Sequence, residues 1–129
     1  MDQRLVQIAL VVKDYDEAIS FYTQKLGFEL TEDTRLTETK RWVVVKPKGG
    51  GSCSLLLAKA VNEEQEKAIG NQTGGRVFLF LYTDNIDRDY QHFKMNNIKF
   101  VRELSNEPYG TVAVFEDLYG NLWDLIQPR

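Results

Sequence analysis

Cysteine and histidine, two residue types that commonly act as nucleophile, base or metal ligand, are scarce in this sequence. Its 129 residues include one cysteine, Cys53, and one histidine, His92. A lone histidine cannot make a two- or three-histidine metal site, and a lone cysteine cannot form an intrachain disulfide. Cys53 has no base beside it in the sequence and His92 falls in a predicted helix, so we expect an inert thiol and a histidine with a surface or packing role. Much of metalloenzyme chemistry is thereby excluded.

Alternating aromatic residues instead indicate a binding surface. Phe78, Phe80 and Tyr82 occupy every second position of one apolar run, and side chains two apart on a strand share a face. By the same rule Asp124 shares its face with Ile126. Aromatic walls with a few polar groups are typical of small-molecule sites. A filled aromatic core is the alternative interpretation of the same stripe.

Two other conspicuous runs are assigned no chemistry. Gly49–Gly51 leads into a predicted strand, Ser54–Leu57, whereas a phosphate-binding glycine loop leads into a helix. The acidic run at positions 63–66 follows Asn62, a suitable helix cap, and its charges suit the positive end of a helix dipole. We therefore expect a short, solvated connecting helix over residues 62–69.

The elements that must position these residues occur in the same order twice. The first half begins with an apolar run over 5–12 that predicts a strand. An apolar stripe at helical spacing follows, and this predicted helix is capped by Asp14 or Asp16 and ended by Gly27. Three further strands are predicted over 28–31, 42–45 and 54–57, with a polar loop at 34–40. The second half repeats them over 77–83, 86–96, 100–103, 111–115 and 122–126. Each half is therefore predicted to be a strand, helix, three-strand module.

Residue matches support an internal duplication. With the second half laid on the first, Gln7 falls on Phe78 and Tyr15 on Ile86, and with a one-residue adjustment Ser54 falls on Asp124. Two such modules predict an α+β fold, one domain over residues 1–129, in which two four-stranded mixed sheets form a cleft. Module one covers about 4–59 and module two about 76–127.

The chain resembles the glyoxalase I, bleomycin-resistance and extradiol-dioxygenase superfamily, also called the vicinal oxygen chelate superfamily. The resemblance rests on Ile8–Asp14, Phe21-Tyr22 and Leu26-Gly27-Phe28, and on the final hairpin, residues 116–125. Together with the duplication it spans nearly the whole chain. It implies the two-module fold and, for chains of this length, a homodimer.

In metal-dependent members of that superfamily, the first and last strands of each module supply four ligands. The resemblance places Gln7, Ser54, Phe78 and Asp124 at these positions, with Cys53 as the alternative to Ser54. Divalent metals in such sites need imidazole or carboxylate donors. Phe78 offers no donor and Gln7 a weak one, so we expect no metal and no other cofactor.

The cleft residues follow from strand alternation. If Gln7 faces the cleft, so do Ala9 and Val11, and by the duplication so do Phe78, Phe80 and Tyr82. On the third strand either Trp42 or Arg41 points inward, and we favour Trp42. We expect ligand contacts from Gln7, Trp42, Ser54, Phe78, Phe80, Tyr82 and Asp124.

Asp124 is the one ionisable group expected in this cleft, and the candidate general base if the protein is an enzyme. Its apolar surroundings predict desolvation and a raised pKa. A hydrogen bond from Gln7 is the purely structural alternative.

Three functions from different classes remain open. The first is a metal-free protein that binds a small aromatic or cationic molecule through stacking and one carboxylate. The second is a metal-dependent lyase, isomerase or dioxygenase of the same superfamily. The third is a non-catalytic subunit whose fold mediates association.

Net charge and the length of the apolar runs argue against two classes of binding partner, nucleic acid and membrane. Sixteen Lys and Arg against 19 Asp and Glu give a net charge of −3, which provides no general cationic field for nucleic acid. No apolar run approaches the length of a membrane span, and no signal-peptide pattern is seen. We expect a soluble, cytoplasmic protein with a small-molecule ligand.

Overall fold

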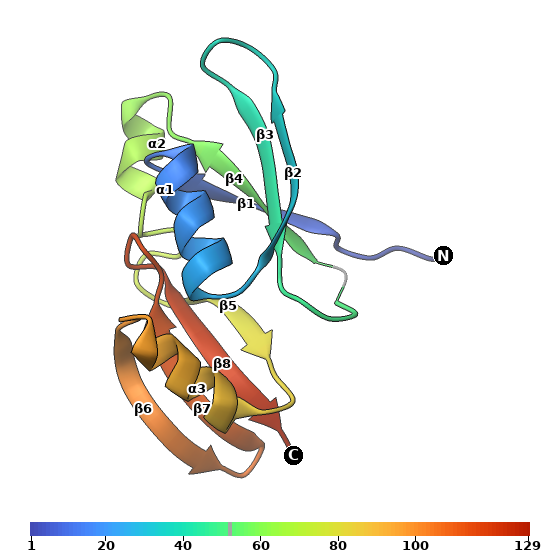
Figure 1. Cartoon of the computed structure of the whole chain (residues 1–129), viewed down its shortest axis with the longest axis vertical. Helices are drawn as coiled ribbons and strands as arrows, with labels where there is room; N and C mark the ends of the chain where they lie inside the picture. Colours follow the sequence, from blue (N-terminus) through green and yellow to red (C-terminus); the bar gives the residue numbers. More distant parts are fainter. Residues whose placement is uncertain (52) are drawn as a thin grey trace. The chain divides into compact units, whose positions relative to one another are not determined.

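The computed structural model describes residues 1–51 and 53–129. The chain divides into two compact units, Met1–Ile69 and Gly70–Arg129, which Figure 1 shows with their helices and strands labelled. Each unit contains one four-stranded mixed sheet with helices. The predicted α+β class and the two tandem modules are therefore confirmed. No helix in the described part of the chain is long and apolar enough to cross a membrane.

Unit 1 holds the sheet with strand order β1-β4-β3-β2. The strands are β1 (Gln7–Val12), β2 (Glu29–Arg35), β3 (Arg41–Lys46) and β4 (Ser54–Lys59). β1 runs parallel to β4, and the other neighbours are antiparallel. The helices are α1 (Tyr15–Ser20), which continues as the π-helical turn η1 (Phe21–Lys25), and α2 (Glu63–Ala68).

Alternation along the strands builds the unit 1 core. On β1, Leu10 and Val12 are fully buried whereas Ala9 is exposed, as expected of a strand covered on one face only. Asp14 caps α1 by accepting a hydrogen bond from the Glu17 N–H at 2.9 Å. The helix then packs Ala18 and its continuation packs Tyr22 into the core.

Unit 2 holds the sheet with strand order β5-β8-β7-β6. Its strands are β5 (Val77–Tyr82), β6 (Phe100–Glu107), β7 (Gly110–Glu116) and β8 (Leu122–Pro128), and its helix is α3 (Ile86–Met95). The core is aromatic: Phe115 stacks on Trp123 and meets Phe93 of α3 edge to face. The topology repeats that of unit 1.

The structure differs from the expectation in three respects, which involve four elements. β2 continues through Arg35 and β6 through Glu107, beyond the predicted ends at Thr31 and Glu103, because antiparallel pairing with the next strand satisfies their backbone groups even where the side chains are polar and exposed. The predicted first helix changes to π-helical geometry at Phe21. The register of β4, described below, is the third difference.

Candidate functional site

The face of the unit 1 sheet that points away from α1 carries several of the predicted ligand residues. We call it the open face of unit 1. Gln7 lies beside Ser54, and the Ser54 hydroxyl donates to Val6 O at 3.2 Å and contacts Gln7 Oε1 at 3.5 Å. The structure therefore brings these two polar side chains together.

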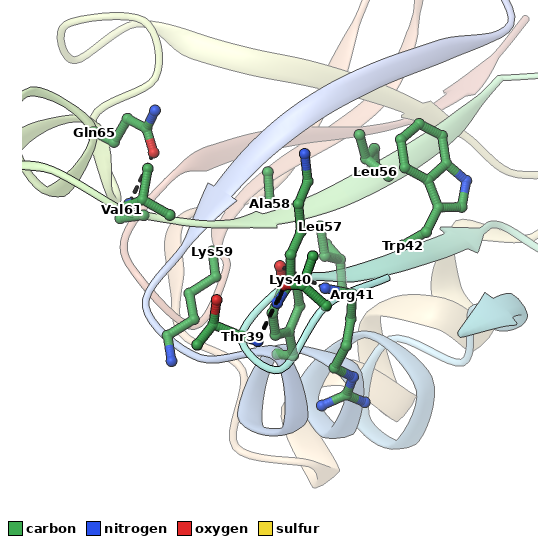
Figure 2. A pocket seen from close by; sticks show the side chains of 13 residues that line it. Thr39, Lys40, Arg41, Trp42, Leu56, Leu57, Ala58, Lys59, Val61 and Gln65 are labelled. Atoms are coloured by element: carbon green, nitrogen blue, oxygen red, sulfur yellow. Dashed lines mark hydrogen bonds between the residues drawn. The ribbon is translucent and has the colours of Figure 1, made fainter. Parts of the chain in front are cut away.

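Trp42 also lies on this open face. Figure 2 shows the side chains of Lys40 and Trp42 on one side of β3, together with Leu56 and Ala58 of β4, and the Arg41 side chain on the other. Arg41 is engaged there, with Nε and Nη2 donating to Asp33 at 3.1 and 2.7 Å and Nη1 donating to Asp16 at 2.9 Å. These hydrogen bonds raise the pKa of Arg41 and lower that of Asp33.

A hollow of about 630 Å³ opens where β3 and β4 separate. Their pairing runs from Val45↔Leu55 to Val43↔Leu57 and stops there. Two residues beyond Val43, the backbone N–H of Arg41 donates to the Tyr15 hydroxyl of α1 at 3.2 Å rather than to β4. Side chains of β3, β4, α2 and the β2–β3 turn line this β3–β4 hollow, including Lys40, Trp42, Leu56, Ala58 and Gln65.

The equivalent open face of unit 2 carries aromatic side chains, one carboxylate and one cation, Arg102. A cross-strand row joins Phe80, Asp124, Val114 and Arg102 on β5, β8, β7 and β6. Phe80 is 63% exposed and Tyr82 69% exposed. Such exposure is unusual for large apolar side chains, and it marks this face as a candidate contact surface.

Asp124 is half-buried in that row. Burial raises its pKa, and the charge of Arg102 partly opposes the rise, which confirms the expected direction. The Asp124 side chain forms no hydrogen bond or ion pair with another described residue of unit 2. Within unit 1, Gln7 Oε1 contacts the Ser54 hydroxyl, and a hydrogen bond from the Gln7 amide to Asp124 stays a prediction.

The remaining candidates lie apart from these faces. His92 is exposed on α3, where Asn96 contacts its ring and its carbonyl, so it lies in a helix and at the surface. Cys53 is a free thiol. Among residues 1–51 and 53–129, no three His, Cys, Asp or Glu side chains gather into a group able to hold a metal ion.

Comparison with known proteins identifies the family. Residues 4–125 match the model of the Glyoxalase/Bleomycin resistance protein/Dioxygenase superfamily. The chain belongs to this superfamily. An uncharacterized protein of Shewanella frigidimarina (strain NCIMB 400) is 62% identical over 98% of this chain and 95% of its own length. The uncharacterized protein YurT of Bacillus subtilis (strain 168) is 31% identical over 96% of this chain and 98% of its own length.

Two solved structures share the fold. UcmS2 is 32% identical and superposes with a TM-score of 0.85, covering 98% of both chains. TnmS3, described as an antibiotic binding protein from Streptomyces sp. CB03234, is 28% identical with a TM-score of 0.79 and covers 99% of this chain and 98% of its own.

Strand register revises one of the superfamily ligand positions. Gln7 matches Phe78, so Ala9 matches Phe80. Asp124 lies opposite Phe80, and the residue opposite Ala9 is Leu56. Leu56, rather than Ser54, is therefore the unit 1 counterpart of Asp124. The sequence comparison missed it because the glycine run before β4 conceals a shift of two residues.

Proposed function

We propose that this protein binds a small aromatic or cationic molecule without a metal ion, on the open faces of its sheets. One observation carries the proposal: Phe80 and Tyr82 stay largely exposed beside a half-buried carboxylate that has no hydrogen-bond partner among the described residues of unit 2. The similarity to TnmS3, whose description is that of an antibiotic binding protein, supports a binding role.

The chemistry of the unit 2 face suits such a ligand. Exposed aromatic rings gain free energy by stacking against a planar molecule, since both surfaces leave water. Asp124 supplies one half-buried negative charge beside Phe80, with Arg102 two strands away, and an ion pair at such a site is stronger than in water. A cationic group on the ligand would stabilise the charged form of Asp124 and so offset its desolvation.

The residues at the metal positions do not fit a divalent ion. With the corrected register these positions hold Gln7, Leu56, Phe78 and Asp124. Leu56 and Phe78 offer no donor atom and the Gln7 amide is a weak ligand, which leaves one carboxylate. A metal-dependent lyase, isomerase or dioxygenase is therefore the weaker proposal, and we assign no metal-assisted step.

A thermal-shift screen of aromatic amines and uncharged aromatic compounds, followed by calorimetry, tests the binding proposal. For a cationic hit, Asp124→Asn should weaken binding by about 1.5 to 3 kcal/mol, as is typical of hydrogen bonds to charged groups. Asp87→Asn, at an exposed position of α3, is the matched control and should leave affinity unchanged. If no compound binds, or if the hits bind equally to both variants and to Phe80→Ala, the proposal is wrong.

The proposal includes a homodimer located in the cytoplasm, as expected from the resemblance and the sequence. Light scattering should give twice the 14.9 kDa of one chain, and a monomer at micromolar concentration would contradict the dimer. A subunit that only mediates association would also dimerise, but it would not gain thermal stability from any ligand.

A further inference from the structure

The β3–β4 hollow differs in charge from the unit 2 face, which carries the carboxylate Asp124 and the cation Arg102. Its described lining residues include three cations, Lys40, Arg41 and Lys59, and no carboxylate. The charge of Arg41 is already balanced, because Asp16 and Asp33 bind its guanidinium at 2.9 and 2.7 Å. Lys40 and Lys59 form no ion pair within the ranges 1–51 and 53–129. The hollow therefore has an uncompensated positive charge.

The backbone of the β2–β3 turn holds Lys40 in place beside this hollow. The Lys40 carbonyl accepts hydrogen bonds from the N–H groups of Leu36 and Thr37 at 2.8 and 3.1 Å. The Lys40 N–H in turn donates to the Thr37 hydroxyl oxygen at 3.0 Å. The turn is closed by these bonds, so the lysine projects from a defined position.

The Trp42 side chain lies on the same side of β3 as the Lys40 side chain. Figure 2 shows Lys40 and Trp42 projecting together toward the side of Leu56 and Ala58, whereas Arg41 and Lys59 point to the opposite side. Indole, leucine and alanine side chains form an apolar wall, and the ammonium group lies at its edge. This combination suits a planar molecule with a negatively charged substituent.

We propose that the β3–β4 hollow binds an aromatic compound that carries an anionic group, such as a carboxylate or sulfonate. The ring of the compound packs against Trp42 and Leu56, and Lys40 pairs with the anion. This inference rests on the proposed small-molecule function, and it names the ligand class for unit 1. A ligand whose only charge is positive is disfavoured here, since Lys40 repels it.

A pair of fluorescent dyes with the same ring system tests the charge preference. The dyes are 1-anilinonaphthalene-8-sulfonate and its uncharged parent N-phenyl-1-naphthylamine. Dissociation constants are measured for the full-length wild-type chain and for Lys40→Gln, Lys40→Arg and Trp42→Leu. Lys48→Gln is the matched control, because Lys48 is an exposed lysine beyond the other end of β3 and does not line the hollow.

The proposal expects the sulfonate to bind more tightly than the parent. Lys40→Gln should weaken sulfonate binding about three- to fivefold, the size typical of an exposed charge pair, and leave the parent dye unchanged. Lys40→Arg should restore the affinity, and Lys48→Gln should not alter it. Trp42→Leu should weaken both dyes, and added salt should weaken only the sulfonate.

Other results would overturn the proposal in distinguishable ways. In one such result, both dyes bind with equal affinity, Lys40→Gln has no effect and Trp42→Leu weakens binding. The hollow would then bind aromatic molecules without a preference for anions, and the proposed binding function would stand. Binding of neither dye would remove the hollow as a site. The screen with Asp124→Asn and Phe80→Ala would still decide the function independently.

Discussion

The two units are copies of one module, yet their central strand pairs differ. In unit 2, β7 and β8 remain paired from Gly110↔Pro128 to Glu116↔Leu122. In unit 1, β3 and β4 separate beyond Val43↔Leu57, and a hollow opens. Duplication has thus preserved the topology while one strand pair opened and its counterpart stayed closed.

A difference at the start of the helix accompanies this divergence. In unit 1 the hydroxyl of Tyr15 accepts the Arg41 N–H, which no longer pairs with β4. The matching residue in unit 2 is Ile86, which has no hydroxyl, and its own N–H donates to Gln127 Oε1 of β8 at 2.8 Å. One tyrosine oxygen therefore satisfies a backbone donor that would otherwise be left unpaired by the opening.

The largest expected effect is a loss of unfolding free energy when one core leucine is truncated in each unit. Leu57 and Leu125 occupy matching places, opposite Leu10 and Leu81, and both are fully buried. Leu→Ala at either position should cost about 2 to 5 kcal/mol of unfolding free energy. Leu57→Ala should cost less, because Leu57 also lines the hollow and its surroundings can relax. Chemical denaturation of the two variants measures this, and a larger loss in Leu57→Ala would contradict the comparison.

A smaller effect is expected on the pH dependence of stability, through Asp124 of unit 2. The pKa of Asp124 is raised by burial, so the folded state holds its proton more tightly than the unfolded state does. As pH rises from about 4 toward neutrality, the wild type should lose stability relative to Asp124→Asn. The two should converge again as the pH falls and Asp124 becomes protonated.

Unfolding free energies measured across this pH range test the expectation. Asp87→Asn serves as the control, because Asp87 is an exposed carboxylate on α3 of the same unit. A stability difference between wild type and Asp124→Asn that does not change with pH would contradict the desolvation of Asp124.

The smallest effect tests the role of Tyr15. Tyr15→Phe removes the acceptor of the Arg41 N–H, and should cost about 0.5 to 1.5 kcal/mol. Tyr90→Phe in unit 2 is the comparison and should cost less. Among residues 1–51 and 53–129, the Tyr90 hydroxyl accepts one long hydrogen bond, from the Lys94 ammonium at 3.5 Å. Equal losses in the two variants would show that the Tyr15 hydroxyl has no special part in the opening.

The sequence predicted the fold better than the site. Apolar runs such as those of β1 and β5, together with the caps Asp14 and Asn62, are local signals, and the structure contains the corresponding elements. The match of Leu56 to Asp124 depends on strand register, which the glycine run before β4 conceals. No local pattern shows that β3 leaves β4, since that opening involves a hydroxyl on α1.

Lys40 was missed for a related reason. In the sequence it belongs to a polar segment with no periodicity, and only the closed turn and the neighbouring Trp42 ring give it a candidate role. Phe80, Tyr82 and Asp124 could be placed from the sequence because side chains alternate along a strand, and Phe80 does lie opposite Asp124. Their role in ligand binding stays a prediction.

Calorimetry with and without a chelator tests the central claim, metal-independent binding of a small molecule, most directly. The protein is titrated with a cationic aromatic hit from the screen, before and after exhaustive treatment with EDTA, and its metal content is measured in parallel. We predict the same affinity and stoichiometry in both titrations, with about 1.5 to 3 kcal/mol lost in Asp124→Asn. One equivalent of bound zinc, nickel, manganese or iron, removed by EDTA together with ligand binding, would contradict the account.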